Sequence, residues 1–333
     1  MNNIIDAEPN GNAQKVQNIR VDPESDGQRL DNFLMRHLKG APKTLIYRII
    51  RSGEVRLNKG RAAADTRIQT DDLIRVPPLR LSSPKSEGGA APAREFPVLH
   101  EDDCLLAIDK PSGVAVHGGS GVSFGVIEQL RQARPMARML ELVHRLDRET
   151  SGVLLVAKKR SALKHVQDQF RDRETGKTYL ALVQGQWPSN RKVIDLPLEK
   201  YLLPNGQGEG ERRVRVVAKD GPKGMRAITL IKVAKLVGSC TLLEVTIKTG
   251  RTHQIRVHLA SLGHPILGDD KYGDFEANRK LQKLGLKRMF LHAWRLQFRH
   301  PSSGENLRLE SPLPAELQQF VDTLQPGGPV ASL

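Results

Sequence analysis

A charged segment directly before a wholly apolar one is the feature that most constrains the fold of this sequence. Residues 144–149 read His-Arg-Leu-Asp-Arg-Glu, and residues 153–157 read Val-Leu-Leu-Val-Ala. Apolar residues at consecutive positions predict a strand that is covered on both faces. The intervening Thr-Ser-Gly is typical of a turn, because hydroxyls bond nearby backbone and glycine tolerates a positive φ. We therefore expect Asp147 in a loop that leads into a buried strand.

The charges around Asp147 allow two interpretations. Charged groups are seldom buried unless they are paired. The loop therefore contains either a satisfied ion network or a functional site, and both produce such clusters. On the local pattern alone the ion network is the more common case. The other motifs of the chain bear on the choice.

Two further stretches combine a predicted strand or helix with polar residues. Residues 177–183 form a strand by β-propensity and carry Tyr179. Residues 248–259 end a strand at Gly250 and start a helix with Thr252 as its expected cap. This segment holds two arginines and two histidines, more than packing alone explains. Its histidines are five positions apart, not the four of a helical metal pair, so we expect no metal there.

The charge of the chain indicates a polyanionic partner. The formal net charge is +15 and the sequence pI is near 10, and a positive field attracts and steers phosphates. Residues 28–80 hold twelve Lys or Arg against five Asp or Glu, nearly half of the net charge. Aromatic residues make up only 4% of the chain, which disfavours a surface on which single-stranded bases stack.

Composition and periodicity divide the chain into segments. We expect a tail at 1–18, a small basic unit at 19–80, a linker at 81–97, a larger unit at 98–320 and a C-terminal tail at 321–333. Apolar residues at helical spacing predict helices at 27–39 and 42–53 in the small unit, followed by strands at 54–57 and 72–76. The larger unit has the pattern of an α+β fold, with helices at 124–132 and 161–171 and a hairpin over 227–247.

The sequence shows no segment that would direct the protein to a membrane or into a secretory pathway. No apolar run approaches the roughly 18 residues of a membrane span, and the N-terminus lacks the basic and apolar regions of a signal peptide. Cys104 and Cys240 lie far apart within apolar runs, as buried reduced thiols do. We expect a cytoplasmic protein.

The small basic unit resembles the S4 RNA-binding domain. The resemblance is carried by Gly-Gln-Arg-Leu-Asp-Asn-Phe-Leu at 27–34 and by Arg-Ser-Gly-Glu-Val at 51–55. It implies two helices and a strand that present cations to structured RNA. Such cations add affinity and register rather than sequence readout. The candidate phosphate contacts are Arg36, Lys43, Arg48, Arg51 and Arg56; otherwise these cations form a solvated face.

The larger unit resembles the pseudouridine synthases of the large-subunit and tRNA group. His-Arg-Leu-Asp-Arg-Glu-Thr-Ser-Gly at 144–152 matches the signature of that family. Tyr179 within Lys-Thr-Tyr-Leu-Ala and Arg251 within Gly-Arg-Thr-His-Gln-Ile-Arg match its second and third motifs, in the same order. The resemblance implies a mostly antiparallel mixed β-sheet flanked by helices, preceded by the S4 domain.

The resemblance also implies an activity, the isomerisation of uridine to pseudouridine in large-subunit (23S) ribosomal RNA. Asp147 would act at C1′ as nucleophile or as base, Tyr179 would stack on the base, and Arg251 would keep Asp147 ionised. Arg145, His144 and Arg256 are candidate substrate-binding residues. The reaction needs no metal, nucleotide or other cofactor, and we expect a monomer that contacts no membrane. The alternative is a non-catalytic S4-type RNA-binding or ribosome-assembly protein.

Overall fold

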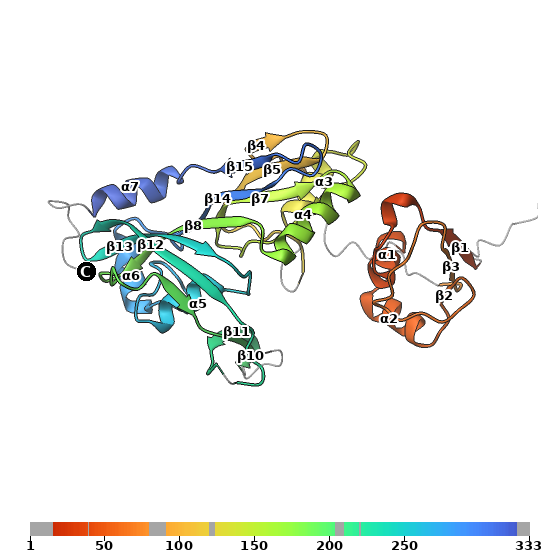
Figure 1. Cartoon of the computed structure of the whole chain (residues 1–333), viewed down its shortest axis with the longest axis horizontal. Coiled ribbons are helices and arrows are strands. Elements are labelled where there is room, and N and C mark those ends of the chain that lie inside the picture. The colour runs from red at the N-terminus through yellow and green to blue at the C-terminus, as the bar shows by residue number, and fades with distance from the viewer. Residues whose placement is uncertain are drawn as a thin grey trace, which may run out of the picture. The chain divides into compact units, whose positions relative to one another are not determined.

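The chain forms two compact units, Met1–Ala90 and Ala91–Leu333 (Figure 1). The structure, a computed structural model, describes residues 16–38, 40–79, 91–119, 124–203, 210–219 and 221–324. Most of the expected tails at 1–18 and 321–333, and residues 81–90 of the expected linker, lie outside the described residues. The first described strand begins at Gln17, and the last helix ends at Thr323.

The N-terminal unit packs two helices on a small antiparallel sheet. Its elements are β1 (Gln17–Arg20), the 3₁₀ helix η1 (Pro23–Ser25), α1 (Leu30–His37), α2 (Lys43–Arg51), β2 (Arg56–Leu57) and β3 (Leu73–Val76). The strand order is β1-β3-β2. Leu30, Phe33 and Leu34 lie at helical spacing and are fully buried against Ile46 and Ile49 of α2. The two predicted helices and two predicted strands are therefore confirmed, with slightly shorter helices.

The C-terminal unit is built on one ten-stranded mixed sheet with the order β4-β5-β7-β14-β8-β13-β12-β9. β15 pairs with β14, and β6 pairs with β7. The strands of this sheet are β4 (Val98–Glu101), β5 (Leu105–Lys110), β6 (Glu141–Leu142), β7 (Ser151–Ala157), β8 (Gly176–Gln184), β9 (Val193–Asp195), β12 (Ile228–Val237), β13 (Cys240–Ile247), β14 (Leu291–Arg299) and β15 (Asn306–Glu310). Among the described strands only β7 and β14 pair in parallel. The expected mostly antiparallel α+β fold is confirmed.

Helices and a separate hairpin complete this unit. They are α3 (Val126–Ala133), α4 (Arg160–Asp172), α5 (Gln254–Ser261), α6 (Phe275–Lys283), α7 (Ala315–Thr323) and the hairpin of β10 (Leu198–Leu203) and β11 (Glu211–Val216). The predicted helices at 124–132 and 161–171 and the predicted hairpin over 227–247 correspond to α3, α4 and β12–β13. Within the part of the chain that the structure describes, no helix has the length and apolar character to cross a bilayer.

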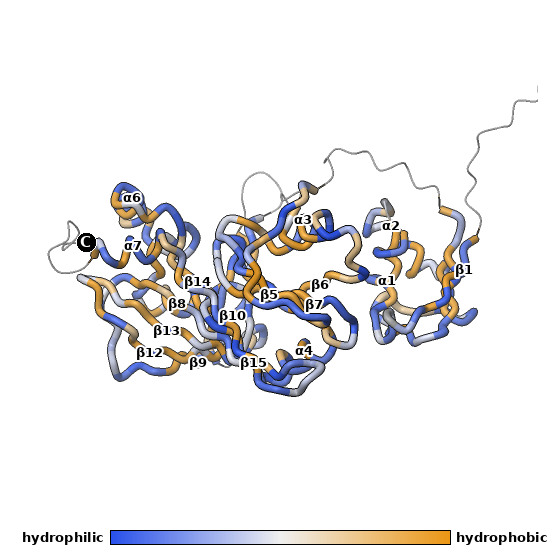
Figure 2. The backbone as a smooth tube through the Cα atoms, turned by 90° about the horizontal axis from the view of Figure 1, so that it is seen from above, coloured by the Kyte–Doolittle hydropathy of each residue, from blue (hydrophilic) through white to orange (hydrophobic). Residues whose placement is uncertain are grey.

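Burial of β7 on both faces explains its sequence. Val153 and Leu155 pack with α4, whereas Leu154 and Val156 pack with α3. Figure 2 shows β5 and β7 as mostly hydrophobic segments of the chain. The strand begins at Ser151, two residues earlier than the apolar run, because Ser151 and Gly152 pair with His292 and Ala293 of β14.

Gly152 allows β7 and β14 to approach closely. Its φ is 111°, and a Cβ atom at this position would lie 2.2 Å from the carbonyl oxygen of Ala293. A side chain would therefore collide with rigid backbone and also occupy a conformation that L-residues rarely adopt. Only glycine fits at the end of the loop that carries Asp147.

Candidate active site

The loop that carries Asp147 connects β6 to β7 and is held by a buried lysine. Lys110 is fully buried, and its Nζ donates hydrogen bonds to the carbonyl oxygens of Pro111 (2.8 Å), Val114 (2.8 Å) and Arg148 (3.1 Å). Burial lowers the pKa of Lys110 to about 7, whereas three carbonyl acceptors favour the ammonium form. The lysine thus ties the residue after Asp147 to the turn that follows β5.

A buried arginine lies beside Asp147. Nη1 of Arg256, on α5, is 3.5 Å from Oδ2 of Asp147. Nε and Nη2 of the same guanidinium each donate a hydrogen bond of 2.7 Å to Asp269. Burial alone would lower the pKa of Arg256, but the hydrogen bonds and charge of Asp269, with the charge of Asp147, raise it above its usual value. The site therefore contains a permanent cation in a fixed orientation.

His253 is the second group that faces Asp147, with Nε2 at 3.9 Å from Oδ2. Its backbone is left-handed, with φ of 51°, at the N-cap of α5, so the helix starts later than the expected cap at Thr252. The backbone N–H of Val214 donates to the hydroxyl oxygen of Tyr272 (3.1 Å), which lies 2.8 Å from Nδ1 of His253.

The protonation state of His253 follows from these contacts. Burial lowers the pKa of His253, opposed by the charge of Asp147, so the ring is neutral near pH 7. The carboxylate of Asp147 favours the tautomer with a proton directed toward it, and the Tyr272 hydroxyl then donates to Nδ1 of His253. The ring proton then lies on Nε2, the nitrogen that faces Asp147.

The segment before α5 is fixed by the buried side chain of Gln254. Its Oε1 accepts hydrogen bonds from the Thr249 hydroxyl (2.7 Å) and the Arg251 backbone N–H (3.1 Å). Its Nε2 donates to the Ile228 carbonyl and the Thr229 hydroxyl, each at 3.0 Å. All four bonds of this amide are therefore used to hold the turn that places Arg251 and His253.

Asp147 lies where two adjoining cavities meet. One has a volume of about 110 Å³ and includes Tyr179 and Arg251 in its wall. The other, of about 480 Å³, is lined by Arg148, Arg213 and Lys271 together with Glu149, Glu211 and Asp270. Both cavities share five residues: Arg145, Leu146, Asp147, His253 and Arg256. A small, partly apolar recess thus opens into a wider cleft that is lined by charged side chains of both signs.

Tyr179 on β8 forms one wall of the smaller cavity. The ring is half-buried between two clusters of the core. Burial raises the pKa of its hydroxyl, and the charge of Asp147 raises it further. The phenol therefore stays protonated and offers a rigid aromatic surface near the carboxylate.

Comparison with known proteins identifies the family. The sequence profile of RNA pseudouridylate synthases matches residues 104–261, and that of the S4 domain matches residues 28–74. Ribosomal large subunit pseudouridine synthase C of Pasteurella multocida is 49% identical over 317 residues, which is 94% of this chain and 95% of the relative. The chain belongs to the RNA pseudouridylate synthase family. The enzyme of the same name from Escherichia coli is 48% identical over 317 residues, 93% of this chain and 97% of the relative.

Solved structures of pseudouridylate synthases share the fold. Human RNA pseudouridylate synthase domain containing 4 is 29% identical with a TM-score of 0.55, covering 68% of this chain and 93% of that chain. Human RNA pseudouridylate synthase domain containing 1 is 25% identical with a TM-score of 0.53, covering 71% and 96%. The family resemblance drawn from the three sequence motifs is thus confirmed.

The structure of this pseudouridine synthase brings most of the predicted site residues together. Asp147, Tyr179, Arg251, Arg145 and Arg256 all line the smaller cavity. The expected charge partner of Asp147 is corrected: the ion pair comes from Arg256, while Nε of Arg251 donates to the Arg226 carbonyl at 3.2 Å. Arg251 precedes α5 and its side chain turns to the Arg226 carbonyl, whereas Arg256 lies within the helix and reaches the carboxylate.

His144 lies away from both cavities, contrary to its assignment as a substrate-binding residue. Its ring stacks on Phe170 of α4 at 5.2 Å, and its Nε2 accepts the backbone N–H of Leu155 at 3.1 Å. Burial lowers the pKa of His144 to about 3, and the nearby Lys177 lowers it further. In this synthase the residue is a neutral part of the framework behind the loop.

The five candidate phosphate contacts of the S4 domain are available to a ligand. Arg36, Lys43, Arg48 and Arg51 are exposed, and Arg56 is half-buried. Among the described residues, no hydrogen bond or ion pair of these side chains is present.

The residues that the sequence interpretation missed are His253, Tyr272 and Asp269. The sequence positions of Tyr272 and Asp269 did not indicate a role in the site, because only the fold brings residues 269–272 next to α5.

Proposed function

We propose that this protein isomerises specific uridines of large-subunit (23S) ribosomal RNA to pseudouridine. It is an RNA pseudouridylate synthase by family, and the names of its relatives specify the ribosomal large subunit. The observation that carries the proposal is the position of Asp147, 3.5 Å from the buried Arg256 in the wall of a cavity that Tyr179 also lines.

The chemistry rearranges one nucleoside without a net change in composition. The N1–C1′ bond breaks, the uracil turns, and C5 bonds to C1′; C5 then loses a proton and N1 gains one. Asp147 initiates this either as a nucleophile at C1′ or as a base. Both roles require the carboxylate, and Nη1 of Arg256 lies 3.5 Å from it. No step requires a metal, a nucleotide or another cofactor.

The other residues of the cavity hold the base and its surroundings. Tyr179 presents a planar surface for stacking on the uracil. Arg251 contributes a cation to the same recess, and the exposed Arg145 is free to fill the space that an extruded uridine leaves in the RNA. Extrusion of a base costs a few kcal/mol. Contacts of the S4 domain with phosphates contribute binding free energy that offsets this cost.

The oligomeric state and location follow from the same proposal. We propose that the protein acts as a monomer. Because ribosomal RNA is the proposed substrate, we place the protein in the cytoplasm.

The decisive experiment replaces the carboxylate and keeps its shape. Asp147→Asn should bind large-subunit rRNA like the unchanged protein but form no pseudouridine, measured by mapping pseudouridine in rRNA incubated with each protein. Asp168→Asn, which removes a half-exposed carboxylate from α4, is the matched control and should retain activity. An unchanged yield from Asp147→Asn would contradict the mechanism. Absence of pseudouridine with the unchanged protein would instead support the non-catalytic RNA-binding alternative.

A further inference from the structure

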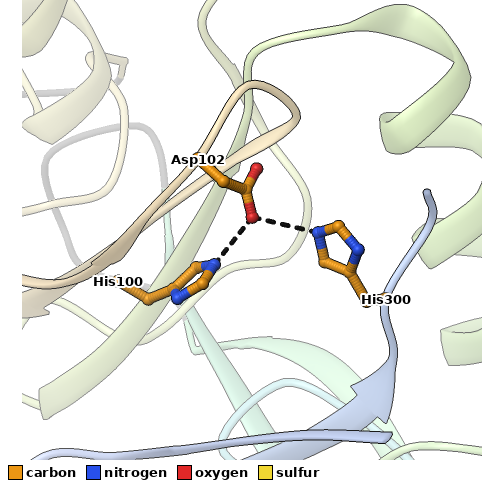
Figure 3. A group of neighbouring side chains, drawn as sticks. All are labelled: His100, Asp102 and His300. Atoms are coloured by element: carbon orange, nitrogen blue, oxygen red, sulfur yellow. Dashed lines mark hydrogen bonds and ion pairs between the residues drawn. The ribbon is translucent and has the colours of Figure 1, made fainter. Parts of the chain in front are cut away.

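A second cluster of polar side chains lies where β4 and β14 end. His100 is on β4, Asp102 directly follows that strand, and His300 directly follows β14. Figure 3 shows the two imidazole rings pointing toward the carboxylate from separate segments. Oδ2 of Asp102 lies 2.7 Å from Nε2 of His100 and 3.0 Å from Nε2 of His300. The three possible ligand atoms all lie within 4.8 Å of one another.

Asp102 and His300 are oriented by further contacts. Oδ1 of Asp102 accepts the backbone N–H groups of Cys104 (2.6 Å) and Leu105 (2.8 Å), which leaves Oδ2 directed at the histidines. Nδ1 of His300 lies 3.3 Å from the hydroxyl of Ser303. Metal-binding residues typically have such outer contacts, which fix their orientation and tautomer.

We propose that His100, Asp102 and His300 bind one divalent transition-metal ion of the zinc class. Two imidazole nitrogens and one carboxylate oxygen are a ligand set that zinc uses in proteins, with water in the fourth position. Bond lengths of about 2.0–2.1 Å around a tetrahedral ion place ligand atoms roughly 3.3 Å apart. The present distances from Oδ2 of Asp102 to the two Nε2 atoms, 2.7 Å and 3.0 Å, are shorter than this value, and small side-chain movements would bring them to it.

Metal binding requires both histidines to change tautomer. Without a metal, each imidazole donates its Nε2 proton to Oδ2 of Asp102. The ion takes the place of these two protons, and each neutral ring then carries its proton on Nδ1. In His300, Nδ1 now accepts the backbone N–H groups of Ser302 (3.4 Å) and Ser303 (3.2 Å), so binding requires these groups to turn away and the Ser303 hydroxyl, at 3.3 Å, to accept the ring proton.

The cluster lies at the opposite end of β5 and β7 from Asp147. In their antiparallel register Leu105 pairs with Ala157, whereas Lys110 pairs with Gly152. Asp102 is therefore near the last residue of β7, and Asp147 precedes the first. The length of β7 separates them by roughly 20 Å, at about 3.3 Å per residue. The ion would join the β4–β5 turn to the end of β14, so its effect is on stability and not on the chemistry at Asp147.

The test measures metal binding by the full, untagged chain after removal of metal with a chelator. Titration with Zn²⁺ should show one bound equivalent and a rise in the thermal unfolding temperature, and Co²⁺ should give the visible absorption of a tetrahedral ion. His300→Gln retains an N–H donor for Asp102 and so preserves the hydrogen bond between these residues, but it removes the imidazole ligand. It should weaken Zn²⁺ affinity by more than about 100-fold, because loss of even an outer partner weakens it 10–100-fold.

Two further variants complete the comparison. His100→Ala should show the same loss of Zn²⁺ affinity, whereas His165→Ala, which removes an exposed histidine of α4, should bind like the unchanged protein. Pseudouridine formation should be unaffected in all three variants. The proposal is overturned if the unchanged chain binds no Zn²⁺ at micromolar concentration, because the cluster would then be held by hydrogen bonds alone. Equal affinity in His300→Gln and the unchanged chain would overturn it as well.

Discussion

Asp269 holds the guanidinium group of Arg256 through two hydrogen bonds of 2.7 Å, and both side chains are almost completely buried. The pair fixes the direction in which the remaining nitrogen of Arg256 points, and that nitrogen is the one 3.5 Å from Asp147. A cation that is oriented before the substrate arrives stabilises charge without reorganisation during the reaction. The negative charge of Asp269 therefore contributes to the site, although Asp269 lines neither of the two cavities.

Replacement of Arg256 by Lys tests this orientation. Lysine keeps the charge but cannot make the two-point contact with Asp269. We expect kcat for pseudouridine formation to fall about 100-fold, similar to the loss of one preoriented donor. Arg295→Lys, which alters an exposed pair with Glu310, is the matched control. Full activity of Arg256→Lys would show that charge alone is sufficient.

Replacement of Asp269 by Asn tests the same pair through stability. The change leaves Arg256 buried with its principal partner neutralised, which costs about 3–5 kcal/mol. We expect the free energy of unfolding, measured with urea, to fall by this amount at pH 7. Asp270→Asn is a suitable control, because this carboxylate is 82% exposed and 3.8 Å from Arg256. Equal losses in the two variants would argue against a special role for the buried pair.

Tyr272→Phe tests the tautomer of His253. The change removes the hydroxyl proton that is directed to Nδ1, so the imidazole no longer has to carry its proton on Nε2. Partners that fix a histidine in this way are worth about 10–100-fold in metal sites, and we expect a fall in kcat of similar size. Because the removed bond favoured the neutral ring, the pKa of His253 should rise and the acid limb of the kcat–pH profile should move to higher pH. Tyr201→Phe provides the control, and an unshifted profile would contradict the assignment.

His144 should make stability depend on pH. Its pKa is about 3 in the folded protein and about 6.5 in an unfolded chain. The unfolded state therefore binds more protons between these values, and stability falls as the pH decreases through this window by about 1.4 kcal/mol per unit. In His144→Gln this contribution is absent, so the slope from pH 6 to pH 5 should be smaller by about that amount. Urea unfolding at several pH values measures it, and an identical slope would contradict the neutral state of His144.

The salt dependence of rRNA binding should report the S4 contacts. Changing Arg36, Lys43, Arg48 and Arg51 together to Gln should reduce the slope of log K against log salt by about 0.7–0.9 for each phosphate that the variant no longer neutralises. The control changes three exposed cations of α6, Arg279, Lys280 and Lys283, to Gln. A similar slope for both variants would show that the S4 face does not contact the RNA.

Local patterns predicted the elements but not every contact in the site. The run Val153–Ala157 correctly indicated a strand buried on both faces, because periodicity depends only on neighbouring residues. The roles of Arg251 and Arg256 depended instead on the directions of their side chains around the start of α5, where His253 has a left-handed backbone. Histidine adopts this conformation more often than most residues do, but it does so too rarely for the sequence to mark the position. His144 was misplaced because adjacent loop residues point in different directions once a ring stacks on α4.

Contacts between distant segments were outside the reach of sequence patterns. Nothing in the local sequence distinguishes Asp269 or Tyr272, yet they set the orientation of Arg256 and the tautomer of His253. The metal cluster joins Asp102 to His300, 198 positions away. No spacing rule covers such a pair, because its geometry arises only when β14 takes its place in the sheet.

The position of β14 between β7 and β8 has a consequence for biosynthesis. β7 begins four residues after Asp147, and β8 carries Tyr179, but the strand that lies between them is the last long strand to be translated (Figure 1). A ribosome must therefore release the chain beyond Arg299 before these two side chains can reach their final separation. Nascent chains emerge in N- to C-terminal order, so the S4 domain is ready to bind RNA well before the catalytic unit is complete. The surroundings of Asp147 can therefore be completed only after most of the chain has been synthesised.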